Sequence, residues 1–192
     1  PKLVVLGCGD NEDLTGIDLS RVPALTTLNL QNSSITQIDL SQVPNLTELD
    51  CSYCKLSALD LSQVPDLNWL YCESILLAEL DLSPVPKLVQ LSCVENNLTA
   101  LDLSTLPELT FLDCSYNSLT KLNLSDVPKL AELCCTENKI TNLDIRPLEN
   151  LRTFCHDPFV SVTKSPGQQY EKDEYLVKIE IPSKNYFEIK HG

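Results

Sequence analysis

The sequence predicts a right-handed solenoid of short coils with a parallel β-sheet along its concave side, and three observations support this fold class. A tetrapeptide of the form I/L-D-L-S first appears at Ile17 and returns every 21 residues, at Ile38, Leu59, Leu80 and Leu101, and then as LNLS at Leu122 and LDIR at Leu143. Between successive copies the apolar residues keep the spacing L-x-x-L-x-C-x-x-N-x-L. One such unit holds about seven apolar positions, roughly 2 kcal/mol each when buried, against an ordering cost of about 1.5 kcal/mol per residue. A single unit is therefore unstable alone, and successive units must stack.

The segment around the cysteine predicts one strand in each coil. Side chains alternate between the two faces of a strand, so Leu49 and Cys51 are expected to point inward, and Glu48, Asp50 and Ser52 outward. An incomplete leading copy over residues 3–11 fills the same positions. Together the copies predict a concave parallel sheet of about eight strands.

The return side of each coil is predicted to be mostly irregular, with 3-10 turns or short strands. A short strand is expected at L-D-L, followed by a tight helical turn or a polyproline-like bend at the Val-Pro pair, because proline cannot donate a hydrogen bond to a sheet. Asparagine recurs where the chain leaves the strand, and its side chain can hydrogen-bond the backbone of the bend. The residues concerned are Asn11, Asn96, Asn117 and Asn138.

The repeat pattern divides the chain into two parts. Residues 1–156 are predicted to form the solenoid, and residues 157–192 a β-rich C-terminal cap that covers the apolar end of the stack. Within the cap, β-type alternation is present at residues 160–162, 175–181 and 186–189.

Composition excludes several classes of function. The 27 acidic and 14 basic residues give a net charge of −13, which opposes binding to nucleic acids and to anionic membranes. No apolar run reaches the roughly 18 residues of a membrane span. With two histidines, five glycines and no phosphate-binding loop or nucleophile elbow, the chain is predicted to have no catalytic residues and no cofactor. Since it contains no methionine, we interpret it as a processed piece of a longer protein.

Most of the nine cysteines fall in one column of the repeat. Cys8, Cys51, Cys72, Cys93, Cys114 and Cys135 share this position, and His156 occupies it in the last copy. Stacked side chains run parallel instead of pointing at each other, so these thiols are expected to be buried and free of disulfides. Cys134 and Cys155 occupy the outward position one strand apart, where they could be reactive. A redox pair or a metal site with His156 is an alternative, but neither Cys134 nor Cys155 belongs to a Cys-x-x-Cys motif.

On these motifs the chain resembles bacterial 21-residue leucine-rich-repeat proteins, and in particular the cysteine-ladder branch of the internalins. The stretches ELDCSYCKLSALDLS at residues 48–62 and FLDCSYNSLTKLNLS at residues 111–125 carry the resemblance best, and it extends over residues 1 to about 156. The resemblance implies a secreted or cell-surface bacterial adhesin or virulence protein. A cytoplasmic location is the alternative.

The outward positions of the predicted sheet suggest a partner-binding face. Large aromatic and acidic side chains gather there, and no lysine or arginine occupies a strand position; the candidate residues are Trp69, Tyr71, Tyr53, Phe111, Tyr116, Glu48, Asp50, Glu73, Glu95, Asp113 and Glu132. Aromatic anchors among steering charges are typical of protein-recognition sites. The expected partner is a basic protein or peptide, bound by a monomer. Alternatively, the aromatic residues only pack across strands and the acids only confer solubility.

Two further alternatives concern the acidic column and the role of the module. The aspartates that follow the first residue of each tetrapeptide, Asp18 to Asp144, could bind calcium, but such residues more often cap turns through backbone hydrogen bonds. No metal site is therefore predicted. The module itself could instead target a separate catalytic domain of an intracellular or translocated effector, or serve as a structural spacer.

Overall fold

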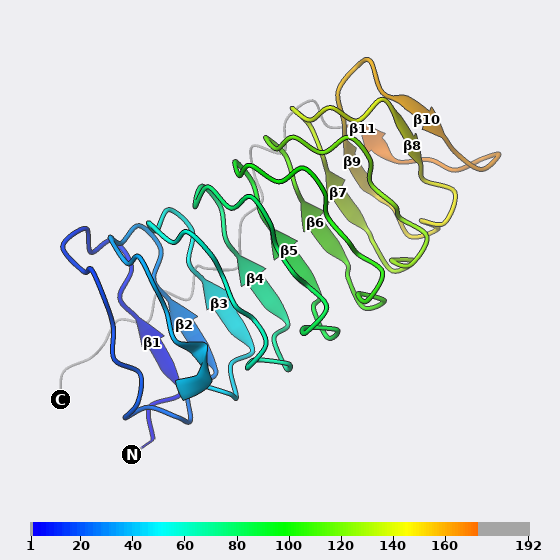
Figure 1. The fold of residues 1–192 in the computed structure, drawn as a ribbon. Helices are drawn as coiled ribbons and strands as arrows, with labels where there is room; N and C mark the ends of the chain where they lie inside the picture. Colours follow the sequence, from blue (N-terminus) through cyan, green and yellow to red (C-terminus); the bar gives the residue numbers. More distant parts are fainter. Residues whose placement is uncertain (1, 173–192) are drawn as a thin grey trace.

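The computed structural model describes residues 2–172 and shows a solenoid whose strands lie side by side along one flank (Figure 1). Nine strands form one parallel sheet in the order β1-β2-β3-β4-β5-β6-β7-β9-β11. Their bounds are Val5–Gly7, Thr27–Asn29, Glu48–Asp50, Trp69–Tyr71, Gln90–Ser92, Phe111–Asp113, Glu132–Cys134, Thr153–Cys155 and Glu171–Lys172. The predicted parallel sheet is confirmed, and the segment that follows the repeats adds its last strand, β11.

The strands pair in an unbroken register that follows the 21-residue period. Leu49 of β3 lies opposite Leu70 of β4, which lies opposite Leu91 of β5. The two end intervals depart from the period: Val5 pairs with Thr27, one residue later than the period gives, and Thr153 pairs with Glu171, three residues earlier. Equivalent side chains therefore stack in columns along the solenoid.

The columns form one continuous hydrophobic core inside the coil. The central leucine of each strand from β2 to β7 is at most 1% exposed. The cysteine column is also buried, with Cys51, Cys72, Cys93 and Cys114 fully inaccessible. Val43, Val64 and Val85 close the core from the return side and are 0% exposed. The inward positions predicted from alternation are confirmed.

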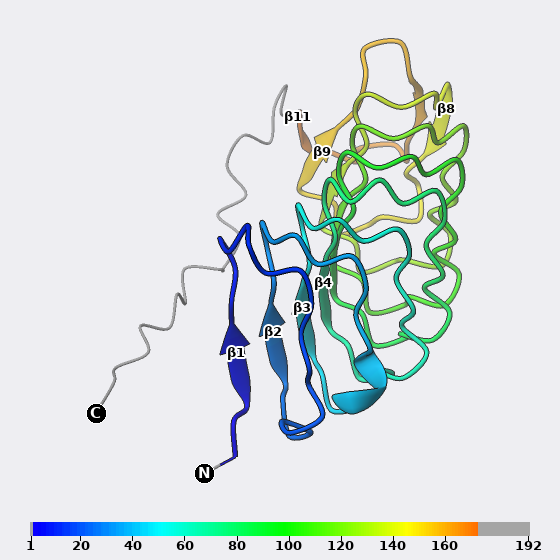
Figure 2. The same ribbon diagram turned by 60° about the vertical axis from the view of Figure 1, so that its left-hand side comes forward.

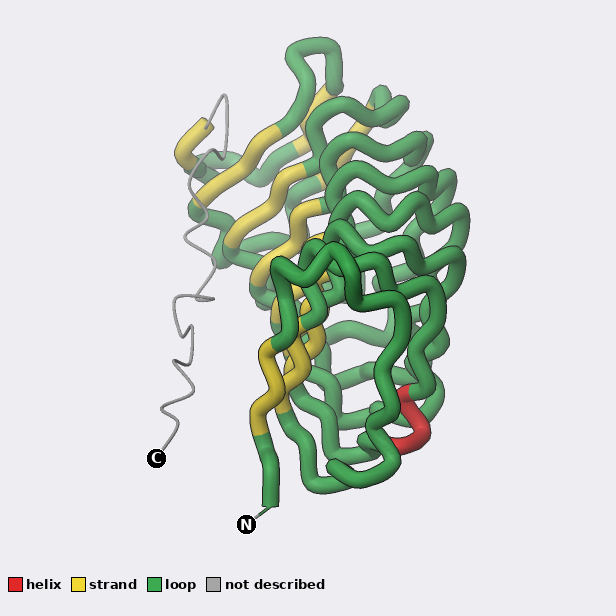
Figure 3. The backbone as a smooth tube through the Cα atoms, turned by 90° about the vertical axis from the view of Figure 1, so that its left-hand side faces the viewer, coloured by secondary structure: helices red, strands yellow, loops and turns green. Residues whose placement is uncertain are grey.

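The return side consists of tight turns. In a typical coil, Val64 N donates to Leu61 O and Leu67 N donates to Val64 O, both at 3.1 Å, so two successive turns surround the Val-Pro pair. One coil tightens further into a 3-10 helix, η1, at Leu40–Gln42. Figure 2 and Figure 3 show η1 on the side of the coil opposite the strands.

The prediction of a short strand at each L-D-L segment is wrong for most coils. Only one such segment of the described chain is a strand, β8 at Asn142–Asp144, and it pairs with β10 at Ser161–Thr163 in a separate two-stranded sheet. The aspartate side chain binds the backbone two residues on in most coils, and Asp144 of β8 does the same, so this contact does not prevent a strand. What sets β8 apart is its neighbour β10, which supplies the pairing partner. Of the cap predictions, β10 matches the expected alternation at residues 160–162, and the strands expected at 175–181 and 186–189 lie outside the described residues.

The predicted asparagine ladder is confirmed in the middle of the solenoid. Asn117 Nδ2 donates to the carbonyl oxygens of Cys93, Cys114 and Ser115 at 2.9–3.2 Å, and its Oδ1 accepts from Leu98 N at 3.0 Å. Asn96 and Asn138 repeat this pattern. These amides satisfy the backbone groups that each bend leaves unpaired.

Candidate functional site

The candidate site is the outward surface of the nine-stranded sheet, which we call the sheet face. Parallel register arranges its side chains in rows that run along the solenoid. The first row joins Glu48, Trp69, Gln90, Phe111 and Glu132 on consecutive strands. The second row joins Asp50, Tyr71, Ser92, Asp113, Cys134 and Cys155. The structure thus brings the predicted strand residues of the site together.

A third row follows each strand and turns inward more than alternation predicted. Ser52 and Ser115 are only 3% and 4% exposed, so the expectation that Ser52 points freely outward is wrong. Glu73, in the equivalent position after β4, is partly buried. The next residue of most coils has a positive φ, including Tyr53, at 58°, and Tyr116, at 56°. This left-handed backbone turns both tyrosines to the rim of the sheet.

The five predicted aromatic residues divide into two groups. Tyr53 and Tyr116 are 48% and 53% exposed on the rim. Tyr71 and Phe111 are only 8% and 7% exposed, and Trp69 is partly buried. The expectation that all five are exposed is therefore wrong for Tyr71 and Phe111, because alternation sets the direction of a side chain but not how far its surroundings cover it. The Tyr71 hydroxyl also donates to Gln90 Oε1 at 2.7 Å.

The predicted carboxylates accept hydrogen bonds from neighbouring hydroxyl groups. Glu73 Oε1 accepts from Ser92 Oγ and Glu95 Oε2 accepts from Ser74 Oγ, both at 2.6 Å. Glu48 Oε2 accepts from Thr27 Oγ1 at 3.3 Å. Glu132 lies partly buried at the first position of β7. Each of these acids remains on the sheet face, where its charge can act on a partner.

Burial and mutual repulsion alter the titration of this face. Burial raises the pKa of Asp50 and of Asp113, and the negative charge of Glu73 raises both further. Burial together with Asp50, Glu48 and Glu73 raises the pKa of Tyr71 to about 12. The carboxylates therefore act on one another as a coupled negative cluster.

No ion pair among the described side chains of residues 2–171 involves this cluster. The three ion pairs of the described chain join Lys87 with Asp66, Lys129 with Glu108, and Arg146 with Asp144, and none of these residues belongs to the sheet face. Lys172, in β11 at the end of the sheet, is the one basic residue on the nine strands, so the face over β1 to β9 is left acidic.

Cys134 and Cys155 are buried instead of exposed, at 3% and 0%. A hydrogen bond with Cys155 and burial together raise the pKa of the Cys134 thiol far above its ordinary value. Because the thiolate is the reactive form, burial and the raised pKa argue against the alternative that Cys134 is a reactive thiol.

The cysteine column matches its prediction except at Cys8, which is only partly buried because it belongs to the first coil, which has no coil before it. None of the nine cysteines, all of which lie within the described residues, forms a disulfide. Burial raises the pKa of Cys51, Cys72, Cys93 and Cys114 well above the ordinary value. The thiols of Cys51, Cys72 and Cys114 point at carbonyl oxygens of the next coil, for example Cys72 Sγ to Ser92 O at 3.5 Å. The column is a structural ladder.

Sequence reasoning missed three features. Cys54 occupies the asparagine position of its coil, as the repeat frame indicates, but the Cys-x-x-Cys motif that it completes with Cys51 was overlooked. Its thiol donates to Leu30 O at 3.1 Å, in the place of a ladder asparagine. Asp157 uses its carboxylate oxygens to accept from Glu137 N at 2.9 Å and Asn138 N at 3.4 Å. Ser115 Oγ is buried beside the Asp113 carboxylate and the Cys134 thiol, without a hydrogen bond of good geometry. The Cys-x-x-Cys motif of Cys54 could have been recognised from its spacing in the sequence. The roles of Asp157 and Ser115 could not, because they depend on the exact residues at which strands end.

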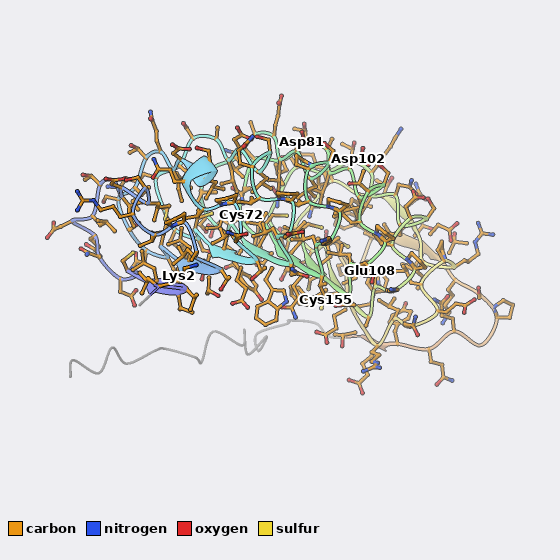
Figure 4. The ribbon with its side chains drawn as sticks, turned by 90° about the horizontal axis from the view of Figure 1, so that it is seen from below. Lys2, Cys72, Asp81, Asp102, Glu108 and Cys155 are labelled. Atoms are coloured by element: carbon orange, nitrogen blue, oxygen red, sulfur yellow. The ribbon has the colours of Figure 1, made fainter. Side chains whose placement is uncertain are left out.

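The aspartate column serves as a set of turn caps. In coil after coil the carboxylate accepts from the backbone N–H two residues on, as Asp81 Oδ1 does from Ser83 N at 2.9 Å. This hydrogen bonding lowers the pKa of Asp81 and of Asp102. Figure 4 shows both residues on the side of the coil away from Cys155 and the strands. The turn-capping interpretation is confirmed.

Two general properties of the described chain bear on function. Residues 2–172 contain no group of three or more histidine, cysteine, aspartate or glutamate side chains placed to hold a metal ion. The helical content of this part is limited to the three residues of η1, so none of its helices could cross a bilayer.

Comparison with solved structures places the chain among leucine-rich-repeat proteins. It is 30% identical, with a TM-score of 0.66, to the functional domain of InlJ from Listeria monocytogenes, which includes a cysteine ladder, and the match covers 84% of this chain. It is 22% identical, with a TM-score of 0.74 over 83% of its length, to a leucine-rich-repeat protein of Leptospira interrogans. The match covers 44% and 43% of those two chains.

A plant structure shares the same fold. The leucine-rich-repeat ectodomain of the receptor kinase GASSHO1/SCHENGEN3 from Arabidopsis thaliana, in complex with CASPARIAN STRIP INTEGRITY FACTOR 2, is 22% identical with a TM-score of 0.65. That match covers 76% of this chain and 19% of the ectodomain. No family model matches the chain, and neither does any curated protein sequence.

Proposed function

Because the chain is a leucine-rich-repeat protein with a cysteine ladder of the kind found in InlJ, we propose that its sheet face recognises another protein or peptide whose contact surface is basic. The observation that carries the proposal is the acidic face itself, with its carboxylates uncompensated and Tyr53 and Tyr116 exposed beside them. Aromatic anchors beside like charges favour a complementary, cationic partner.

The similarity to other proteins supports a binding role. The InlJ match carries the same ladder, and the plant ectodomain, of which only the fold is shared, is bound to another molecule in its structure. We propose further that the chain acts as a monomeric module of a secreted or surface-attached bacterial protein. In that setting the module would supply adhesion, and no catalysis.

The proposal can be tested by selecting peptides on the folded chain. A random 12-residue library displayed on phage, panned against immobilised protein, should enrich sequences rich in lysine and arginine. The selected peptides should bind far more weakly to a variant carrying Tyr53→Ala, Trp69→Ala and Tyr116→Ala. Tyr71 is unsuitable for this test, because it is buried and hydrogen-bonded to Gln90.

A matched control separates the sheet face from general stickiness. Phe159 is 64% exposed and lies beyond β9, outside the sheet face, so Phe159→Ala removes an exposed aromatic residue from elsewhere. It should leave peptide binding unchanged. Equal binding by the triple variant and the unmodified chain would show that the sheet face is not the recognition surface.

A further inference from the structure

The bond between Asp157 and Pro158 is the one Asp-Pro bond of the chain, and it lies between β9, which ends at Cys155, and β10, which begins at Ser161. An Asp-Pro bond is intrinsically labile, because the aspartate carboxylate can attack its own backbone carbonyl carbon and close a five-membered ring. Proline forms a tertiary amide, and its nitrogen leaves as a secondary amine that takes up a proton readily. The groups around this bond therefore decide how fast it breaks.

Two donors converge on the carbonyl oxygen of the bond. Val160 N donates to Asp157 O at 3.1 Å, which closes a tight turn over residues 157–160. His156 Nδ1 lies 2.8 Å from the same oxygen. Since a carbonyl oxygen can only accept, Nδ1 carries the proton and the imidazole is the second donor. Two donors on one carbonyl oxygen are the arrangement that stabilises the oxyanion of a tetrahedral intermediate.

The imidazole ring is held by its neighbour on β9. The centroid of the His156 ring lies 4.5 Å from that of Phe154, and Phe154 is itself fully buried. This contact limits rotation of the imidazole. Little reorganisation is therefore needed when negative charge develops on Asp157 O.

The attacking carboxylate is positioned as well. Asp157 is buried, and backbone N–H groups of the preceding coil donate to its two oxygens, Glu137 N to Oδ1 at 2.9 Å and Asn138 N to Oδ2 at 3.4 Å. A carboxylate offers about four lone-pair sites, so two donors orient the group without occupying all of its acceptor positions. Pro158, on the other side of the bond, is exposed. Its nitrogen can therefore take a proton from water.

We propose that the folded chain cleaves itself between Asp157 and Pro158. A carboxylate oxygen of Asp157 forms a bond to the backbone carbonyl carbon of the same residue, and the carbonyl oxygen becomes an oxyanion that accepts from His156 Nδ1 and Val160 N. The carbon–nitrogen bond then breaks, and the Pro158 nitrogen keeps the electron pair and takes a proton from water. The resulting cyclic anhydride adds one water molecule and opens to the two carboxyl groups of a C-terminal aspartate, whose protons pass to solvent. The net reaction is hydrolysis of one peptide bond.

The reaction is self-processing and not enzymatic turnover, because each chain reacts once. It divides the chain into residues 1–157 and 158–192. The two parts remain in contact, since β10 pairs with β8 and β11 pairs with β9 across the break. The segment after the repeats then stays on the solenoid without a covalent link to it.

The first test compares the folded chain with the same chain in concentrated urea, both at mildly acidic pH and with protease inhibitors present. Intact-mass spectrometry should show fragments 1–157 and 158–192 accumulating from the folded chain. The same bond should break at least about tenfold more slowly in urea, where both donors are lost, since one oxyanion-hole donor contributes about 10²–10³ in rate in enzymes.

Water labelled with heavy oxygen identifies the route. An anhydride is opened at either of its two carbonyl carbons, so part of the product should carry the label in the side-chain carboxyl group of Asp157. Direct hydrolysis by water or by a contaminating protease would label the new C-terminal carboxyl group alone.

Variants separate the roles of the groups. His156→Phe keeps a ring against Phe154 and removes the donor, so it should slow cleavage of the folded chain about tenfold or more and leave the rate in urea unchanged. His156→Gln restores a side-chain donor and should recover part of the rate. Asp157→Asn removes the attacking carboxylate and should abolish labelling through the anhydride. Phe159→Ala is the matched control, because it removes an exposed ring from the same turn and neither donor, and it should cleave at the parent rate.

The proposal is wrong if the folded chain does not cleave, or cleaves no faster than the chain in urea. Heavy oxygen confined to the new C-terminal carboxyl group would also overturn it, and so would a folded His156→Phe variant that cleaves at the parent rate. If His156→Phe does not fold, the parent chain still decides the matter through the comparison with urea and the position of the label.

Discussion

The side-chain amide of Asn117 donates a 2.9 Å hydrogen bond to the carbonyl oxygen of Cys93, one coil earlier in the solenoid. Two further carbonyl oxygens and one backbone N–H are satisfied by the same side chain. A single buried residue therefore holds the bends of neighbouring coils together.

Replacing this residue should destabilise the fold strongly. Asn117→Ala leaves several buried backbone groups unpaired, at about 1–3 kcal/mol each, and we expect a total loss of about 3 kcal/mol in the free energy of unfolding, measured by urea denaturation. Asn97→Ala is the matched control, because Asn97 is exposed and makes a single 3.4 Å hydrogen bond to Leu76 O. Similar losses for the two variants would contradict the ladder as the source of stability.

The thiols should be largely unreactive while the chain is folded. Cys8 is the one cysteine of intermediate exposure, and the other eight are buried. With Ellman's reagent we expect about one thiol, that of Cys8, to react in the native protein, since reaction requires an accessible thiolate, and all nine after unfolding. Burial raises the pKa of Cys8 as well, so its reaction should be slower than that of the thiols of the unfolded chain. Cys8→Ser should remove this native phase. Rapid labelling of Cys134 in the folded chain would show that the pair with Cys155 opens readily.

The repeat frame made most of the fold predictable. Columns such as Leu49 with Leu70, or Cys72 with Cys93, depend only on the 21-residue period and on the alternation of side chains along a strand. The period and the alternation can both be recognised directly in the sequence. The asparagine ladder and the aspartate caps were predictable for a related reason, because short polar side chains bind backbone that lies within a few residues of them.

Details of the site depended on where each strand ends. Alternation continued beyond Asp50 predicts an outward Ser52, but the strand stops at Asp50 and Tyr53 adopts a positive φ. The same break buries Ser115 and moves Tyr116 to the rim. Such breaks follow from hydrogen bonds between coils, such as that of Tyr53 N to Glu73 O at 2.7 Å, which no local pattern displays.

Asp113 should lower stability at neutral pH. Burial raises the pKa of Asp113 in the folded chain, so the ionised form is less favourable there than in the unfolded chain. This destabilisation is full above the folded pKa and disappears as pH falls below the ordinary value of 3.8. Asp113→Asn keeps the acceptor for Ser115 N and should raise the urea midpoint at pH 7.

The gain from Asp113→Asn should shrink progressively as pH is lowered through the raised folded pKa towards 3.8. Asp102→Asn is the control with the opposite sign, since hydrogen bonding to Ser104 lowers the pKa of Asp102. An Asp113→Asn variant that is less stable than the parent at pH 7 would show that the carboxylate is better satisfied than its burial indicates. A gain in stability with a loss of peptide binding would identify Asp113 as a residue kept for recognition.

Asp157 should protect the last full coil from fraying. In the middle of the solenoid a backbone carbonyl of the next coil accepts from each rim N–H, as Ser115 O does from Glu95 N. In the last coil of the asparagine ladder the acceptor is a side chain instead: the Asp157 carboxylate accepts from Glu137 N and Asn138 N. Asp157→Ala should cost about 2 kcal/mol, within the range for buried donors left unpaired.

Hydrogen exchange can localise the effect of Asp157→Ala. The amides of Glu137 and Asn138 should lose protection, while those of the central strand β4 stay protected up to the new global stability. Asp157→Asn keeps one acceptor oxygen and should recover part of the loss, and Glu149→Ala removes an equal charge from an exposed position and should have little effect. Because a solenoid is stabilised by contacts between neighbouring coils, uniform loss of protection across β1 to β9 would mean that Asp157 supports the whole stack and not its end.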